Sequence, residues 1–224
     1  MPIYALGEYE PEIHETAFVH PEAVVIGRVT IGPEASVWPC AVLRGDHGRI
    51  EVGARTSVQD GTVVHCTREW PTLIGADCVV GHNAHLEGCV VGDRCLIGSG
   101  SVTLNRVTVG AGSIVAAACL VPEGFEVPPG TLVAGVPAKI KRTGLSIGFT
   151  DNPVKTYIET SRAHRSGLRR LDVPRAPAGP ANPSSPTHAT SPTSNTSPTN
   201  TTSHTSLGGL GWPPGFDVPS RHSA

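Results

Sequence analysis

The sequence predicts an all-β fold, a left-handed parallel β-helix of hexapeptide repeats, followed by a C-terminal α-helix and a disordered tail. Aliphatic residues recur every six positions, small residues keep a constant place in each hexad, and only 4% of residues are aromatic. A period of six fits neither an amphipathic helix nor an alternating strand, so each hexad is one short strand and one corner. Three such sides close a triangular coil. Its left hand is taken from the hexapeptide pattern itself.

The repeats occupy residues 1–143, where the aliphatic of each hexad is expected to point inward and to stack on its equivalent about 4.8 Å away. The inward positions are Ile13, Val19, Val25, Ile31, Val37, Leu43, Val52, Val58, Val64, Ile74, Val80, Leu86, Val91, Ile97, Thr103, Val109, Val115 and Val121. The small residues expected inside the corners are Ala35, Cys78, Ala84, Cys95, Ser101, Ser113 and Cys119.

Two spacings exceed six residues. Leu43 to Val52 and Val64 to Ile74 are too long for one hexad. We therefore expect loops to leave the coil around residues 44–49 and 67–71. Loops carried by a rigid scaffold are common places for function.

A helix is predicted over residues 150–172. Asp151 or Asn152 can cap it and Pro153 suits its first turn. The residues that share its apolar face are Val154, Tyr157, Ile158 and Ser161. We expect this face to pack on the coil or on a neighbouring subunit.

Residues 173–224 are rich in Pro, Ser, Thr and Asn and are predicted to be a disordered tail. The net charge of −2 comes from mixed acids and bases, which argues against a nucleic-acid partner. The first residues lack the features of an export signal, and no apolar run is long enough to span a membrane. A cytoplasmic protein without a membrane partner is expected.

Three histidines can be placed on the coil. His65 follows inward Val64 and Glu87 follows inward Leu86, so both side chains point outward. Their separation equals one coil plus the extra residues of the second loop, which predicts that His65 and Glu87 stack on one face.

His82 lies near a corner of the preceding side and is predicted to point away from His65 and Glu87. It could complete a site on a neighbouring subunit. His85 flanks Leu86 on the same outward side as Glu87 and is expected to lie near Val63. It is an alternative ligand if the site shifts along the strand.

Several motifs resemble those of the gamma-class carbonic anhydrase family, in the same order along roughly residues 1–170. They are Arg44-Gly45-Asp46, Gln59-Asp60-Gly61, His65, Gly81-His82-Asn83-Ala84, Gly88-Cys89 and Gly135-Val136-Pro137-Ala138-Lys139. The resemblance implies a homotrimer with one zinc or iron ion at each subunit interface. Two ligands would come from one chain and the third from its neighbour.

The resemblance assigns His65 and His82 to two of the family's three histidine ligands, whereas the third position holds Glu87. Two histidines and a carboxylate are an accepted zinc set. An anionic ligand raises the pKa of metal-bound water, so slower hydration is expected. The alternative is that these side chains are interface polar residues without metal.

The resemblance also suggests roles for residues in and near the first predicted loop. Arg44 and Asp46 resemble the pair that organises the interface and site, and Asp60 resembles the arginine's partner across subunits. Gln59 resembles the side chain that hydrogen-bonds the metal-bound water. His47 replaces a proton-shuttling glutamate and suits proton relay. A purely structural ion-pair network is the alternative for this set.

The function that the resemblance implies is reversible hydration of CO2 to bicarbonate by a metal-bound hydroxide, a lyase activity. A second hypothesis is a non-catalytic or altered-substrate trimer with a binding or assembly role. A hexapeptide acyltransferase or acyl-CoA thioesterase is a third, less favoured because such acyltransferases carry their histidine on a longer loop. The fold does not choose among them.

Overall fold

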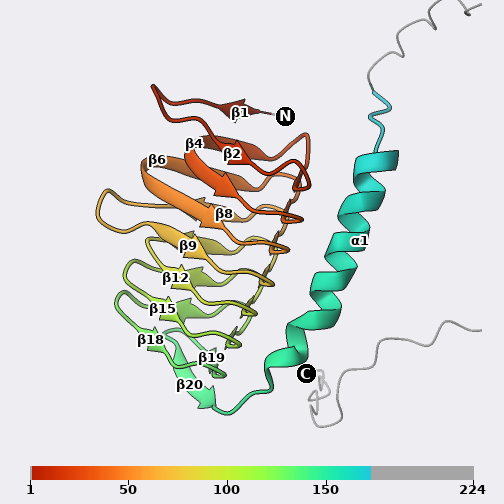
Figure 1. Ribbon diagram of the computed structural model, residues 1–224. Coiled ribbons are helices and arrows are strands. Elements are labelled where there is room, and N and C mark those ends of the chain that lie inside the picture. Colours follow the sequence, from red (N-terminus) through yellow and green to blue (C-terminus); the bar gives the residue numbers. More distant parts are fainter. Residues whose placement is uncertain (1, 173–224) are drawn as a thin grey trace, which may run out of the picture. The chain divides into compact units, whose positions relative to one another are not determined.

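The computed structural model describes residues 2–172, which form a three-sided coil of short strands with one helix alongside (Figure 1). The predicted left-handed parallel β-helix is confirmed. The predicted tail, residues 173–224, lies outside the described residues.

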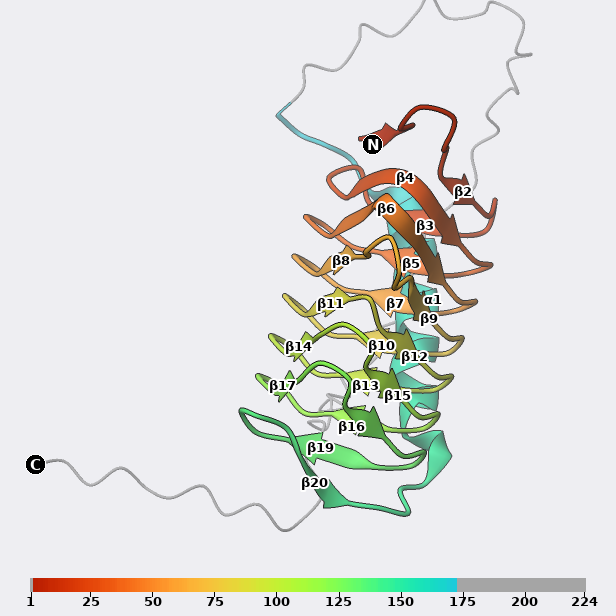
Figure 2. The ribbon, with the colours of Figure 1, turned by 90° about the vertical axis from the view of Figure 1, so that its left-hand side faces the viewer.

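One face of the coil is an eight-stranded sheet whose strands stack as rungs (Figure 2). In order, its strands are β3 (Phe18–Val19), β5 (Ser36–Val37), β7 (Ser57–Val58), β10 (Val79–Val80), β13 (Leu96–Ile97), β16 (Ile114–Val115), β19 (Leu132–Ala134) and β20 (Lys139–Arg142). Only β20 pairs antiparallel with its neighbour. Its exposed cationic side chains close this end of the sheet, which discourages pairing with another chain.

The other two faces share a twelve-stranded sheet, because β4 (Val24–Ile31) and β6 (Val42–Val52) run across the corner between them. The second face continues with β8 (Val63–His65), β11 (His85–Glu87), β14 (Val102–Thr103) and β17 (Leu120–Val121). The third face holds β2 (Glu12–Ile13), β9 (Thr72–Ile74), β12 (Val90–Val91), β15 (Thr108–Val109) and β18 (Glu126–Val127). The short β1 (Ile3–Tyr4) pairs with the start of β4.

The core is the predicted column of aliphatic side chains. Every predicted inward residue from Val25 to Val121 is at most 3% exposed, and every predicted corner residue is at most 1% exposed. Ile13 is half-buried because it lies at the N-terminal end of the coil. The period of six therefore predicted the inward face correctly, since each coil must bury one aliphatic per side.

The register between β4 and β6 is interrupted at one corner. Gly27 lies opposite Gly45, but Val29 lies opposite Ile50. A single residue of β4 therefore faces the four residues 46–49 of β6, and we call this segment the β6 bulge. Bulges of this kind re-aim side chains away from the regular strand pattern.

The loop predicted at residues 44–49 needs correction, because these residues belong to one long strand and only the β6 bulge leaves the pairing. Strand β4 extends alongside and keeps the rest of the segment hydrogen-bonded. The loop predicted at residues 67–71 is confirmed, since it lies between β8 and β9. Backbone and side-chain hydrogen bonds of 3.0 Å between Thr67 and Trp70 close it.

The C-terminal helix α1 (Asp151–Gly167) follows a short 3-10 turn, η1 (Ile147–Thr150). The predicted cap is wrong, because Thr150 is the N-cap and Asp151 is the first helical residue. The helix ends at Gly167, earlier than the expected 172. Within residues 2–172, no helix has both the length and the apolar character needed to cross a bilayer.

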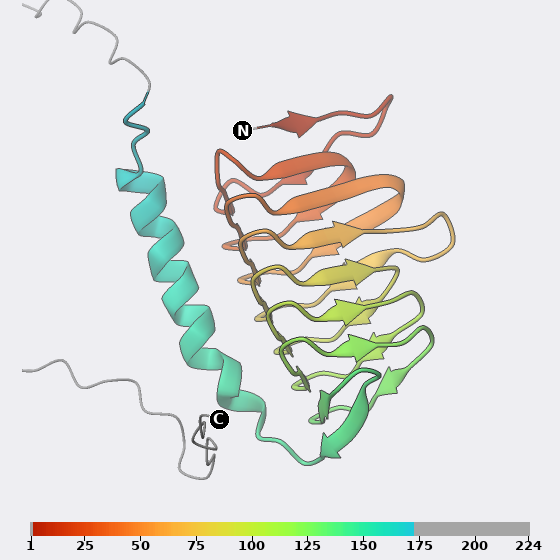
Figure 3. The same cartoon turned by 180° about the vertical axis from the view of Figure 1, so that it is seen from behind.

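Helix α1 runs along the eight-stranded face (Figures 1 and 3). Its predicted apolar face is confirmed, with Val154 and Ser161 buried. Trp38, which is 5% exposed, lies 5.7 Å from the ring of Tyr157 and 5.2 Å from that of His164. Aromatic contacts at these distances favour edge-on packing, so one buried indole anchors the helix to the coil.

Candidate metal centre

His65 and Glu87 are paired in register on the neighbouring strands β8 and β11. The Nδ1 atom of His65 lies 2.8 Å from Oε1 of Glu87. Both side chains point out of the coil, as predicted, and both remain largely shielded. The stacking follows because the 22 positions between them are one coil plus the extra residues of the loop at 67–71, which brings them to paired positions on adjacent strands.

Asp46 contacts the other side of the same imidazole. Its Oδ1 atom lies 3.0 Å from Nε2 of His65, and its Oδ2 atom accepts a hydrogen bond from Arg44. The sequence reasoning missed the Asp46–His65 contact. The register of Arg44 with His65 could have indicated it, because the β6 bulge begins immediately afterwards.

His47 joins this group from the β6 bulge. Its Nδ1 atom lies 3.6 Å from Oδ1 of Asp46, and its ring centre lies 5.8 Å from that of His65. One potential ligand atom from each of Asp46, His47 and His65 lies within 4.8 Å of the other two. Two imidazoles and one carboxylate therefore converge within a single chain.

Both carboxylates are held in the ionised form. Hydrogen bonding from His65 lowers the pKa of Glu87 and outweighs its partial burial. Burial of Asp46 acts to raise its pKa, but hydrogen bonds from His65 and Arg44 lower it overall. Asp46 and Glu87 thus place two negatively charged carboxylates, which can act as metal ligands, around His65 at neutral pH.

His82 and Asp60 form a separate pair, with Nδ1 of His82 2.9 Å from Oδ2 of Asp60. They lie at the start of the second face, whereas His65 and Glu87 lie at its end. Asp60 lies in the turn that precedes β8, whereas His65 is the last residue of that strand. His82 thus contacts Asp60 and does not belong to the cluster of Asp46, His47 and His65.

Gln59 is buried beside α1. It is 4% exposed and lies near Tyr157, whose pKa is raised mainly by burial. The helix thus holds the side chain next to Asp60, on the same corner as His82. Sequence reasoning named Gln59 and Tyr157 separately and did not connect them.

His85 lies opposite Val63, as predicted. Its Nε2 atom is 3.4 Å from Oε2 of Glu87, so it reaches the carboxylate that His65 also contacts. His85 therefore supports the position of Glu87 from the far side.

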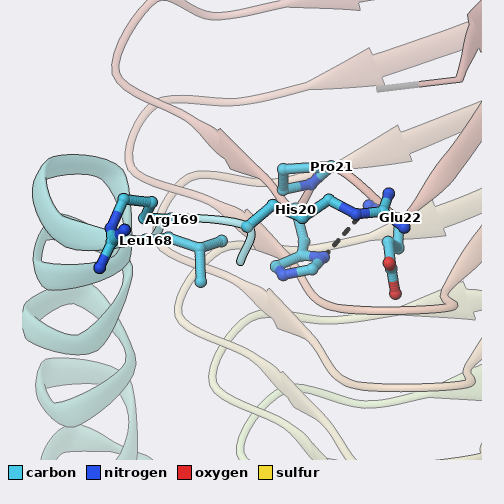
Figure 4. Close-up of a pocket in the computed structure, with 6 residues that line it drawn as sticks. His20, Pro21, Glu22, Leu168 and Arg169 are labelled. Carbon is cyan, nitrogen blue, oxygen red and sulfur yellow. Dashed lines mark hydrogen bonds between the residues drawn. The ribbon is translucent and has the colours of Figure 1, made fainter. Parts of the chain in front are cut away.

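A pocket of about 250 Å³ lies away from these groups (Figure 4). Its lining combines the first corner of the coil with the residues that follow α1, namely His20, Pro21, Glu22, Leu168, Arg169 and Arg170. His20 accepts a hydrogen bond from the backbone of Glu22, and burial lowers its pKa. None of the predicted site residues lines this pocket.

The comparisons with known proteins agree with the fold. Residues 71–105 match the family model "Bacterial transferase hexapeptide (six repeats)". The carnitine operon protein CaiE of Escherichia coli O7:K1 is 42% identical over 142 residues, which cover 63% of this chain and 72% of CaiE.

Gamma carbonic anhydrase 2, a mitochondrial protein of Arabidopsis thaliana, is 38% identical over 178 residues, 74% of this chain and 64% of the plant protein. A hexapeptide transferase family protein from Anaplasma phagocytophilum has a crystal structure with a TM-score of 0.70 and 37% identity. That match covers 73% of this chain and 98% of the other.

Fold and repeat define a hexapeptide-repeat β-helix protein. The chain belongs to the family that includes CaiE and the gamma-class carbonic anhydrases. Because the family holds members other than anhydrases, membership alone does not assign an activity.

Proposed function

We propose that three copies of this chain form a ring, that each interface holds one zinc or iron ion, and that the assembly hydrates CO2 reversibly to bicarbonate. The observation that carries the proposal is the separation of two half-sites on one face. His65 with Glu87 lies at the end of that face, and His82 with Asp60 lies at its start.

A closed ring can bring such half-sites together. In a heterologous interface, one patch of each subunit meets a different patch of the next, and a threefold rotation closes the set. The end of one chain's face would then meet the start of its neighbour's. A neighbouring His82 would complete the donor set begun by His65 and Glu87.

The residues present fit a divalent metal. Two imidazoles and one carboxylate form a known catalytic zinc set that leaves a position open. Asp46, on the far nitrogen of His65, supplies the outer carboxylate that orients such ligands. Arg44 in turn donates a hydrogen bond to Asp46. The neighbour's own Asp60 and Gln59 would lie beside its His82.

When bound, the metal supplies a Lewis acid that lowers the pKa of water and so provides hydroxide near neutral pH. Gln59 can orient the attacking group through its amide. His47 is half-exposed beside Asp46, so it can pass a proton between the site and buffer. Glu87 adds negative charge where the family has a neutral imidazole, and we therefore expect slow hydration.

One observation favours the alternative, a non-catalytic relative with a binding or assembly role. Both ring nitrogens of His65 face carboxylates, Nδ1 toward Glu87 and Nε2 toward Asp46. A doubly protonated imidazole satisfies this arrangement without any metal.

The test is metal content per subunit together with CO2 hydration, measured for the native chain and for Glu87→His. We expect bound metal and slow hydration in the native protein, and faster hydration in Glu87→His because the neutral ligand lowers the pKa of bound water. His14→Gln, at an exposed residue that follows β2 at the N-terminal end of the coil, is the control.

A native protein without metal or activity, paired with a Glu87→His variant that gains both, would support the non-catalytic alternative. Absence of both from the two proteins would contradict the anhydrase proposal altogether.

A further inference from the structure

We propose that Asp46, His47 and His65 form a transition-metal site contained within one chain. This site goes beyond the proposed function, because it needs neither Glu87 as a ligand nor a neighbouring subunit. It would take Zn²⁺ or a similar nitrogen-preferring divalent ion rather than Mg²⁺ or Ca²⁺, which prefer oxygen ligands.

The spacing of the donor atoms suits such an ion. Zinc ligands lie about 2.0–2.2 Å from the metal, so neighbouring tetrahedral ligand atoms lie about 3.4 Å apart. Oδ1 of Asp46 is 3.0 Å from Nε2 of His65 and 3.6 Å from Nδ1 of His47. These two separations lie on either side of the required value, and the ligand atoms of His47 and His65 lie within 4.8 Å of each other.

The β6 bulge explains how consecutive residues reach one point. In a regular strand the side chains of Asp46 and His47 would point to opposite faces. Here the register of β4 and β6 is broken at residues 46–49, so both side chains turn toward His65. His47 is 53% exposed, whereas Asp46 and His65 are largely shielded, so an ion can enter from solvent on the His47 side.

The surrounding groups keep the three donors in place. Glu87 can accept a hydrogen bond from Nδ1–H of His65, which leaves the lone pair of Nε2 directed toward Asp46 and His47. Arg44 occupies only Oδ2 of Asp46, so Oδ1 stays available. With both imidazoles neutral, Arg44, Asp46 and Glu87 sum to one negative charge, which attracts a dication.

Because His65 belongs to this site and to the proposed interface site, the test must separate them. In full-length, chelator-stripped protein, His82→Gln removes the neighbour's ligand and leaves the single-chain set intact. Zinc affinity and stoichiometry would be measured for His82→Gln, for His82→Gln with His47→Gln, and for His82→Gln with His14→Gln as the matched control. CO2 hydration by the native protein and by His82→Gln tests the proposed function independently.

We expect His82→Gln to bind about one zinc per chain, the His47→Gln double variant to bind at least about tenfold more weakly, and the His14→Gln control to match His82→Gln. If the single variant His82→Gln binds no zinc, the single-chain site is overturned, whereas the interface site is not contradicted. Equal binding by the two double variants would also overturn it, because His47 would then not be a ligand.

Discussion

At the scale of single residues, His65 is positioned by carboxylates on both sides. Glu87 contacts one ring nitrogen and Asp46 contacts the other, and both acids have lowered pKa values. The ring is therefore oriented before any metal arrives. Such preparation reduces the entropy that a site must lose on binding.

The lowered pKa of Glu87 predicts a dependence of stability on pH in the metal-free protein. Its contribution is present above the ordinary glutamic acid pKa of about 4.3 and is lost as the pH falls through the lower folded value. Glu87→Gln should therefore cost about 1 kcal/mol at pH 7 and little near pH 3. Urea unfolding between pH 3 and pH 7 measures the free energy of unfolding of the native chain and of Glu87→Gln. A difference between them that does not change with pH would contradict the prediction.

Trp38 is the second decisive residue, because its indole nitrogen donates to Ser36 and Ser57 while its ring packs on α1. Trp38→Ala should destabilise the fold by about 3–5 kcal/mol. Tyr4→Ala, at a side chain that is 53% exposed, should change stability by less than about 0.5 kcal/mol. Thermal unfolding of both variants measures the difference, and similar midpoints would show that the indole does not anchor the helix.

At the scale of elements, the β6 bulge and the loop at residues 67–71 lie against each other. A Cβ atom at Gly48 would come within 2.2 Å of the backbone oxygen of Thr67. Glycine is thus required where the two segments touch, because a Cβ atom at Gly48 would overlap the backbone of Thr67. The close contact determines where Asp46 and His47 stand.

Gly48→Ala should therefore displace the bulge and cost about 1–3 kcal/mol, with weaker zinc binding at Asp46 and His47. Gly167→Ala is the control, since a Cβ there meets nothing within 4 Å. Urea unfolding and zinc titration of both variants give the comparison. Unchanged stability in Gly48→Ala would mean that the β6 bulge and the loop at residues 67–71 can move apart without loss of stability, which contradicts the prediction.

At the scale of the whole molecule, the second face carries both half-sites and exposes an apolar residue between them. Val63 on β8 is 37% exposed, close to His65 in sequence and on the same face. An apolar side chain beside half of a polar site is typical of a surface that meets another chain.

Val63→Asp should convert the proposed trimer into monomers, because each interface would bury an unpaired carboxylate. Ile140→Asp, on the terminal strand β20 and 49% exposed, should leave the trimer intact. Light scattering coupled to size-exclusion chromatography measures both masses. A monomeric native protein would contradict the ring and, with it, the interface site.

The sequence alone determined the coil and the phase of its side chains. A period of six dictates which residue of each hexad is buried, and the coil length, with loop residues added, dictates which outward residues become neighbours. The sequence therefore pairs His65 with Glu87 and places His82 apart from them.

Only the tertiary structure decided how Asp46 and His47 turn toward His65, how Gln59 meets Tyr157 and where α1 begins. These contacts depend on an irregular bulge, on rotamers and on the docking of a helix, none of which repeats along the chain. A periodic pattern specifies what recurs, whereas packing between non-repeating segments depends on their combined shape.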